Sequence, residues 1–479
     1  MSVKILEWIE NNQKKFIQIS DRIWNYAELG LFEKKSSRLL ADTLNEAGFT
    51  IELGVADMPT AFIASYGTES PIIAILGEYD ALPGLSQDTT PIKKPLEERA
   101  PGHGCGHNLF GTACLAACLA VKKAIESGEV HGTIRYYGTP AEENADGKGW
   151  MINAGVFDDV DISLTWHPWD VNFVIATNFQ AMYNVVFRFR GQTAHAAGDP
   201  FNGRSALDAV ELMNVGSNYL REHIIPDARI HYVITNGGQA PNIVPDEAEV
   251  WYYVRAPSLN EVKSLYPRVL KVAEGASLMT ETEFESILLG GSANLLPNQT
   301  LEDLLHEKME VVGPPQFTEE EYEFACELRK SFPENYFDNY LAGLPQDARP
   351  FFERFREKEF CDTISPIFGR GTTLGGSTDV GDVSWVTPLA QFATVCGTIG
   401  TPGHSWQQVA QAGMSIGHKG MITAAKILGL AVIELLQNPG LVEKAQKEFE
   451  EKIKTTPFES PLPEGAKPPI EYYKSLYKQ

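Results

Sequence analysis

Residues Ile72 to Asp80 read Ile-Ile-Ala-Ile-Leu-Gly-Glu-Tyr-Asp, a continuous apolar run that leads into two acidic residues. A short apolar run without polar alternation is typical of a strand that is buried on both faces of a parallel sheet. Ligands of open α/β sheets bind beyond the carboxyl ends of the strands, so we expect Asp80 to face a crevice. This segment therefore predicts an α/β fold with its functional site at the strand ends.

The neighbouring sequence repeats this arrangement. Two further strands are predicted at 133–137 and 162–166, and polar residues follow both of them: Glu142 and Glu143 after the first, His167 after the second. We expect these side chains to converge on the same crevice. Helices are predicted by apolar periodicity at 5–29, 36–47, 110–123, 301–311 and 415–437.

Between residues 181 and 293 the pattern changes to strand, helix, two strands, helix and strand. A β-α-β-β-α-β unit of this size predicts a small inserted α+β domain. It divides the remaining chain, 1–180 and 294–479, which we interpret as one catalytic domain whose mostly parallel mixed sheet is flanked by helices. Two segments with little periodicity, 86–100 and 331–370, are expected to line or cover a substrate pocket.

Composition narrows the class of protein. The 479 residues include 63 acidic and 40 basic side chains, and the resulting net charge of -23 opposes binding to nucleic acid or to an anionic membrane surface. No apolar run is expected to span a membrane. The segment 1–12 places Glu and Asn where a signal peptide needs an apolar core. We therefore expect a cytoplasmic protein.

Cys105, Gly106 and His107 place a thiol and an imidazole two positions apart in a glycine-rich turn. Thiolate and neutral imidazole bind ions such as Zn²⁺, Mn²⁺ and Co²⁺. Glycine-rich loops with Cys and His also arise by chance, so the triplet alone does not establish a metal site. The six cysteines do not resemble a disulfide framework, and Cys114 and Cys118 are expected to pack inside a helix-lined core.

His107, His167 and His404 differ from the other seven histidines because each lies beside Gly or Pro at the edge of a regular element. The adjacent Glu142 and Glu143 raise one another's pKa through like-charge repulsion. They form either a solvated acidic turn or a metal site in which Glu143 is a ligand and Glu142 takes a proton from water. Their position after a buried strand favours the metal site.

These motifs together resemble the dinuclear metal-dependent peptidases and amidohydrolases, a family that includes aminoacylases, dipeptidases and indole-acetyl-amino-acid hydrolases. The branch that hydrolyses p-aminobenzoyl-glutamate is the most similar. The likeness spans most of the chain and rests on 77–84, 105–108, 138–143, 166–168, 194–196, 241–245, 377–382 and 400–406.

The resemblance implies two divalent metal ions per chain, with Mn²⁺ favoured and Zn²⁺ as the alternative. The ligands that it implies are Cys105, His107, Glu143, His167 and His404. Whether the cysteine bridges the two ions stays open.

The resemblance also assigns catalytic roles. Glu142 would act as general base and then as proton donor to the leaving amine, and Asp80 would orient a ligand or the base. Many relatives have a histidine ligand at the position of Glu78. This chain departs from that pattern, and we expect His107 to restore the ligand count.

The inserted segment resembles the lid and dimerisation domain of the family. His195 would then stabilise the oxyanion in the partner subunit's active site, although its place in a small-residue loop also suits an ordinary loop residue. Asn242 suits substrate binding or a plain turn, and Arg255 suits either a substrate carboxylate or solvent. Asp379 and Asp382 either support the metal site or cap a helix.

The resemblance therefore implies an enzyme that cleaves the amide bond of an N-acyl or N-aroyl amino acid such as p-aminobenzoyl-glutamate, or of a small dipeptide, with a metal-activated water. An aminoacylase or dipeptidase of other specificity is the first alternative. A non-catalytic metal-binding partner in a hetero-oligomer is the second. A homodimer through the lid domain is expected.

Overall fold

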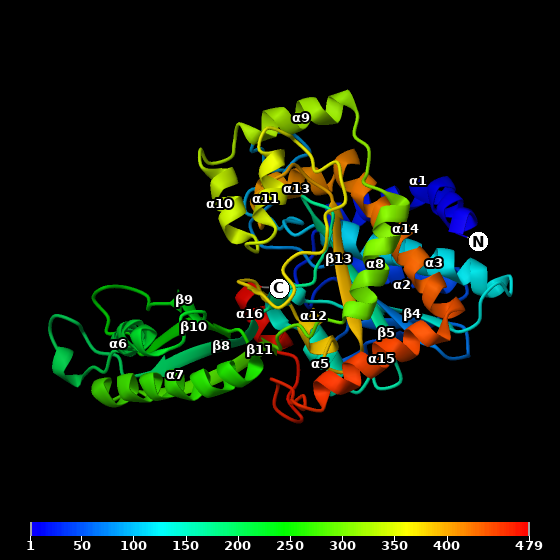
Figure 1. Cartoon of the computed structure of the whole chain (residues 1–479). Coiled ribbons are helices and arrows are strands. Elements are labelled where there is room, and N and C mark those ends of the chain that lie inside the picture. Colours follow the sequence, from blue (N-terminus) through cyan, green and yellow to red (C-terminus); the bar gives the residue numbers. More distant parts are fainter. Residues whose placement is uncertain (1, 478–479) are drawn as a thin grey trace.

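The computed structural model describes residues 2–477 and contains a seven-stranded mixed sheet in the order β1-β2-β4-β3-β5-β13-β6 (Figure 1). The four strands β4, β3, β5 and β13 are parallel to one another, and the outer pairs are antiparallel. The predicted α/β class is confirmed. The strands are β1 (Thr50–Leu53), β2 (Phe62–Tyr66), β3 (Ile72–Gly77), β4 (Thr133–Gly138), β5 (Ile162–Trp169), β6 (Phe173–Val174) and β13 (Leu389–Val395).

Helices cover both faces of this sheet, as β3 itself shows. Ile73 and Ile75 belong to one apolar core, whereas Ala74 and Leu76 belong to another on the opposite face. Successive side chains of a strand point to opposite faces, so a strand buried on both needs an unbroken apolar run. The helices of the first core are α1 (Ser2–Tyr26), α2 (Lys34–Glu46), α3 (His107–Glu126), α8 (Gln299–Val312), α14 (Ser415–Gln437) and α15 (Pro439–Ile453).

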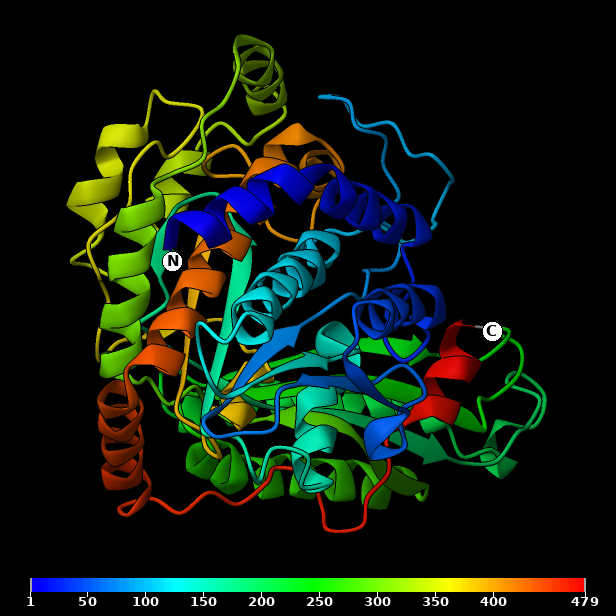
Figure 2. The ribbon, with the colours of Figure 1, turned by 90° about the vertical axis from the view of Figure 1, so that its right-hand side faces the viewer.

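The opposite face is covered by shorter helices. They are α5 (Gly147–Asn153), α12 (Val380–Val383) and α16 (Ile470–Tyr477). In Figure 2 the blue α1, cyan α3 and orange α14 lie side by side over the first face.

Two helices correct the expectation that no apolar run reaches a membrane-spanning length. Both α3 and α14 are long and apolar enough to cross a membrane by length and composition. Each is a core helix instead, because 89% of the apolar window of α3 and 83% of that of α14 are buried inside the protein.

A second, four-stranded antiparallel sheet in the order β11-β8-β10-β9 forms the smaller body in Figure 1. Helices α6 and α7 pack against one face of it. The chain order strand, helix, two strands, helix and strand agrees with the pattern predicted for this segment. Its elements are β8 (Ala181–Arg190), α6 (Ala206–Leu220), β9 (Arg229–Asn236), β10 (Glu247–Ala256), α7 (Leu259–Thr280) and β11 (Glu283–Ser292).

The segment 331–370 has a small aromatic core of its own, to which Phe337, Phe352 and Phe360 belong. Its helices were not predicted, because they are short. They are α10 (Tyr336–Gly343), α11 (Arg349–Phe352) and η4 (Glu353–Phe355), preceded by α9 (Glu319–Arg329). Other short elements are η1 (Val55–Asp57), β7 (Asn178–Phe179), η2 (Pro200–Asn202), η3 (Arg221–His223) and β12 (Thr373–Leu374).

Candidate metal centre

The predicted ligands lie at one end of the parallel strands. Asp80 follows β3, and Glu142 and Glu143 begin α4 (Glu142–Ala145), directly after β4. His167 lies inside β5, because this strand continues to Trp169 instead of ending at residue 166. The crevice predicted at the strand ends is therefore where these side chains meet.

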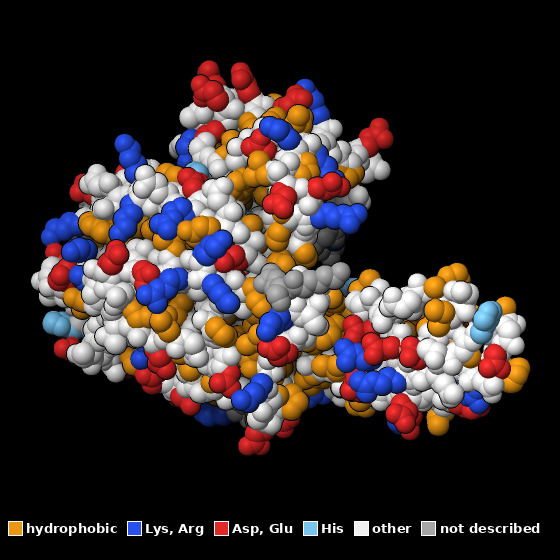
Figure 3. Space-filling model, turned by 180° about the vertical axis from the view of Figure 1, so that it is seen from behind, with side chains coloured by type: hydrophobic (Ala, Val, Ile, Leu, Met, Phe, Trp, Pro, Cys, Tyr) orange, Lys and Arg blue, Asp and Glu red, His pale blue; other side chains and the backbone are white. Residues whose placement is uncertain are grey.

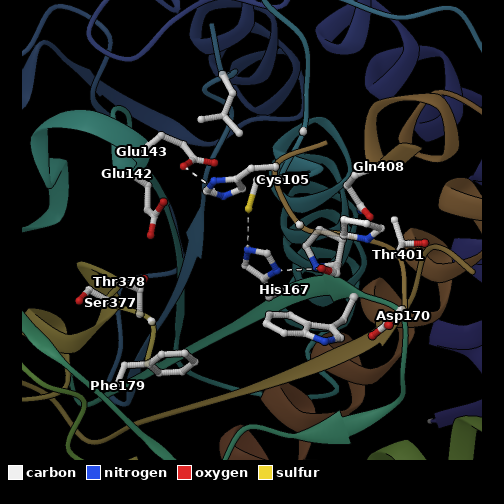
Figure 4. A pocket seen from close by; sticks show the side chains of 18 of the residues that line it. Cys105, Glu142, Glu143, His167, Asp170, Phe179, Ser377, Thr378, Thr401 and Gln408 are labelled. Atoms are coloured by element: carbon white, nitrogen blue, oxygen red, sulfur yellow. Dashed lines mark hydrogen bonds and ion pairs between the residues drawn. The ribbon is translucent and has the colours of Figure 1, made fainter. Parts of the chain in front are cut away.

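The backbone of the Cys105 turn favours glycine at its centre. Gly106 has a φ of 80°, and a Cβ at this position would lie 2.9 Å from Cγ of Pro168. The turn places Sγ of Cys105 3.3 Å from Nε2 of His167 (Figure 4). It also makes His107 the first residue of α3.

Oxygen atoms fix the orientation of the buried imidazole of His107 and the partly buried imidazole of His167. Nδ1 of His107 donates to Oδ1 of Asp80 at 2.8 Å, and Nδ1 of His167 donates to the carbonyl of Pro168 at 2.8 Å. The ring of His167 then keeps its Nε2 lone pair for a ligand. Nε2 of His107 lies 3.1 Å from Oε2 of Glu78, and the charges of Cys105, Asp80 and Glu78 outweigh burial and raise the pKa of His107 well above its ordinary value, so a cation bound here would replace its proton. Burial and the nearby His107 lower the pKa of His167 to about 3, so His167 is neutral, which is the form that binds metals.

Three overlapping groups of metal-binding side chains result. The ligand atoms of Cys105, His107 and His167 all lie within 4.8 Å of one another, and so do those of Cys105, Glu143 and His404. The third group is Glu78, His107 and Glu142. His404 lies in the loop before α13 (Trp406–Ala412), with Nε2 3.5 Å from Oε2 of Glu143. Cys105 is common to the first two groups, which contain the five predicted ligands.

Buried atoms without hydrogen bonds show that the residues fit a divalent cation. Nε2 of His107 and Oε2 of Glu78 are buried 3.1 Å apart without hydrogen-bond geometry, and Oε1 of Glu143 is buried without a hydrogen bond. Such atoms cost free energy unless something satisfies them. Burial and the Glu143 charge also raise the pKa of the Cys105 thiol, so a cation is needed to hold it as thiolate.

Lys148 is the residue of this region that the sequence interpretation missed. It is completely buried, and its Nζ donates to Oε1 of Glu78 and to Oδ1 of Asp379, both at 2.6 Å. Its backbone N–H donates to the other oxygen of Asp379 at 2.8 Å. Asp382, in contrast, accepts from the backbone of Ala293 at 3.1 Å. One sequence signal pointed to a missing basic residue: Glu78 and Asp379 lie in the motifs 77–84 and 377–382, and neither motif contains a lysine or arginine that could balance their negative charges.

A cavity of about 930 Å³ opens in front of the ligands, and Glu142 lines it. Burial, together with the charges of Glu78 and Glu143, raises the pKa of Glu142 well above its ordinary value. Arg255, on β10, lines the cavity from the smaller body, and its buried Nε makes no hydrogen bond. A candidate proton acceptor and a candidate anion-binding group therefore face the same space.

The two irregular segments differ in their relation to this cavity. The segment 331–370 contributes Pro333, Tyr336, Asn339 and Tyr340 to its wall, as expected. Among the described residues that line the cavity, none comes from 86–100, so that expectation is wrong. The segment 86–100 instead folds on itself through its own backbone hydrogen bonds and is largely exposed.

His195 and Asn242 do not line the cavity of their own chain. Asn242 and His195 are both exposed, and they lie beside each other because the Ala196 N–H donates to the carbonyl of Asn242 at 3.1 Å. Nδ1 of His195 accepts from the backbone of Ala197 and Gly198, which leaves its Nε2–H free to donate.

Comparison with known proteins places this geometry in a family. The profile of peptidase family M20/M25/M40 matches residues 74–453. One of the two subunits of the p-aminobenzoyl-glutamate hydrolase of Escherichia coli K12 is 43% identical over 96% of this chain and 97% of its own. The Xaa-Arg dipeptidase of Mus musculus is 28% identical over 93% of this chain and 91% of its own.

A solved structure shares the fold. It is a Bacillus subtilis protein described as a dinuclear metal-binding peptidase, with a TM-score of 0.53 and 17% identity over 89% of this chain and 99% of that one. The profile match covers well over half of the chain, and the E. coli relative is similar over nearly its full length. The chain therefore belongs to peptidase family M20/M25/M40.

Proposed function

We propose that this metallo-amidohydrolase cleaves the amide bond of N-acyl or N-aroyl amino acids, with p-aminobenzoyl-glutamate as the reference substrate. The observation that carries the proposal is a cavity that holds a metal-binding cluster, the partly buried carboxyl of Glu142 and the Nε of Arg255, which makes no hydrogen bond. The E. coli relative, named for this reaction, supports the choice of substrate.

Bound metal ions and the side chains of the protein have different roles in the reaction. Divalent ions, when bound, polarise the amide carbonyl and lower the pKa of a water molecule from about 15.7 to roughly 7. Glu142 takes the proton of the water as its oxygen attacks the carbonyl carbon. When the C–N bond breaks, Glu142 gives that proton to the leaving nitrogen. Glu142 is partly buried, and a substrate that fills the cavity would exclude bulk water from both transfers.

The amino-acid half of the substrate carries a carboxylate, and the cavity offers donors for it. Nε of Arg255 and Oγ of Ser377 both line the cavity and both make no hydrogen bond. A guanidinium pairs with a carboxylate through strong charge-assisted hydrogen bonds. We assign this end of the cavity to the carboxylate of the amino acid.

We propose two ions per chain, shared through Cys105. The two ligand groups that contain the predicted ligands, Cys105–His107–His167 and Cys105–Glu143–His404, overlap only at this residue, which supports a bridging role. The carboxylate and imidazole ligands suit Mn²⁺, which we favour, and the thiolate suits Zn²⁺, which is the alternative.

We further propose a homodimer through the smaller body. Its outer strand β9 exposes Val233 and Ile234, and α6 exposes Leu212, Val215 and Tyr219. Figure 3 shows this body projecting from the rest of the molecule with hydrophobic side chains at its surface. An exposed apolar edge strand is a template for pairing with another copy.

Dimerisation would also give His195 a role, because it lies outside the cavity of its own chain. Its free Nε2–H would donate to the developing oxyanion in the partner subunit's cavity. A hetero-oligomer with a related chain is the second candidate, favoured because the E. coli hydrolase has two different subunits that both resemble this chain. We place the protein in the cytoplasm.

The test uses protein stripped with a chelator and reconstituted with Mn²⁺ or Zn²⁺. We expect metal-dependent hydrolysis of p-aminobenzoyl-glutamate, benzoyl-glutamate or other members of a panel of acyl amino acids and dipeptides. The variant Glu142→Gln should lose turnover while it retains metal, measured by elemental analysis. Turnover that survives this substitution would refute the role of Glu142, and bound metal without any turnover would favour the alternative of a non-catalytic partner.

A further inference from the structure

The cavity has a second polar end, which the proposed mechanism does not use. Asp170 follows β5 directly, is only 6% exposed and lines the cavity. Its Oδ2 accepts from the backbone N–H of Gly400 at 2.6 Å, whereas its Oδ1 is buried and makes no hydrogen bond. A buried carboxylate oxygen without a partner is costly, so a ligand that donates to it is stabilised.

Two tyrosines of α10 belong to the same end of the cavity. Tyr336 and Tyr340 line it, and the hydroxyl oxygen of each is buried without a hydrogen bond. Burial raises the pKa of Asp170 to about 7, against smaller opposite effects of the Gly400 N–H and the neighbouring Tyr340 hydroxyl, and the carboxylate in turn helps burial to raise the pKa of the phenol. Trp169 adds an apolar wall. The end therefore combines one strong acceptor with aromatic surface.

The position of Asp170 assigns this end to the acyl half of a substrate. Figure 4 shows Asp170 and Thr401 on one side of His167, with Ser377 and Thr378 on the other. Ser377 belongs to the end assigned to the amino-acid carboxylate. Asp170 lies three residues after His167, and three residues of extended chain span about 10 Å. A para-substituted benzoyl group with a hydrogen bond at its far end has a comparable length.

We propose that Asp170, with Tyr336 and Tyr340, forms a specificity subsite for acyl groups that end in an N–H donor, such as an aromatic amine. The inference rests on the proposed function and deepens it, because it names the group that the acyl half must carry. The amine donates to Oδ1 of Asp170, and the aromatic side chains enclose its ring.

Asp170→Asn reverses the polarity of this subsite with little change in shape. The amide oxygen can still accept from Gly400, and the NH₂ group replaces the free acceptor. Binding of p-aminobenzoyl-glutamate and of benzoyl-glutamate is measured by calorimetry, on metal-loaded Glu142→Gln so that neither compound is consumed, at pH 8. The control is Asp362→Asn, an exposed aspartate of the segment 331–370, to which Tyr336 and Tyr340 also belong.

In the Glu142→Gln background we expect the p-amino compound to bind about 10-fold or more tightly than the benzoyl compound. Asp170→Asn should abolish this preference and change binding of benzoyl-glutamate by less than about threefold, while metal content stays constant. Tyr340→Phe should reduce the preference in part. Equal binding of the two compounds before the substitution, no binding of either, or an equal loss for both after it, would overturn the inference. Turnover of benzoyl-glutamate by the wild-type enzyme would still support the proposed function, because this compound lacks the amine.

Discussion

Replacing Lys148 with methionine removes the positive charge between Glu78 and Asp379 without opening a large void. Both carboxylates are at most 1% exposed, so they cannot regain water in the folded protein. Breaking a buried ion pair by removal of one partner costs about 3 to 5 kcal/mol. With a urea dependence of about 3 kcal/mol per M, the unfolding midpoint should fall by about 1 to 1.7 M.

Urea unfolding followed by tryptophan fluorescence, on metal-free protein, measures this loss. The control is Lys122→Met. This lysine pairs with the half-exposed Glu126, so its loss should lower the free energy of unfolding by less than about 1 kcal/mol. Burial raises the pKa of Glu78, and loss of Lys148 should raise it further, so a proton neutralises Glu78 at low pH. The deficit should shrink from pH 8 to pH 5. A midpoint equal to that of the control, or a deficit that does not vary with pH, would refute the reasoning.

Three further predictions follow from single contacts. Burial raises the pKa of Glu33 from 4.5 to about 8, so the unfolded chain loses this proton first, and the free energy of unfolding falls as pH rises between these values. The variant Glu33→Gln should therefore flatten the pH dependence of the urea midpoint. Midpoint curves of variant and wild type that run parallel would contradict this. The substitution Gly106→Ala places a Cβ against Pro168 at a residue with a positive φ. It should weaken metal affinity roughly tenfold, as measured by equilibrium dialysis. Unchanged affinity would show that the turn tolerates a side chain. The variants His195→Ala and Glu142→Gln should each be inactive. If the active site is shared across a dimer, mixing the two variants in equal amounts should recover about a quarter of the wild-type activity. No recovery would exclude a shared site.

The parallel strands could be predicted from sequence because burial on both faces leaves an unbroken apolar run, as at Ile72–Leu76. Other elements gave weaker signals. Strand β13, which lies between β5 and the edge strand β6, includes the polar Gln391 and Thr394, so its apolar run is interrupted. Helices α10 and α11 depend on an aromatic cluster that forms only in the folded chain. Tertiary contacts, rather than local pattern, determine these elements.

The same limit applies to the site. Cys105, His107 and His167 could be proposed because each lies in a distinctive local context of Gly or Pro. Lys148 and Asp170 could not, since nothing nearby in the sequence shows that either is buried. Lys148 meets Glu78 and Asp379 across 70 and 231 residues of chain, and Asp170 is recognisable only because its free oxygen faces the cavity.

The two ends of the cavity together explain how an amide substrate is oriented. Burial raises the pKa of Asp170 to about 7, so above this pH a substrate bound backwards would place its carboxylate near a second negative charge in a buried site, and would leave Arg255 without an anion. In the opposite orientation the substrate carboxylate pairs with Arg255 and the acyl amine pairs with Asp170. The carbonyl carbon then lies between these two residues, beside Glu142. The leaving nitrogen then lies on the Arg255 side, because it carries the amino acid. Charge opposition at the Asp170 end therefore selects the one orientation in which the proton held by Glu142 reaches the leaving nitrogen.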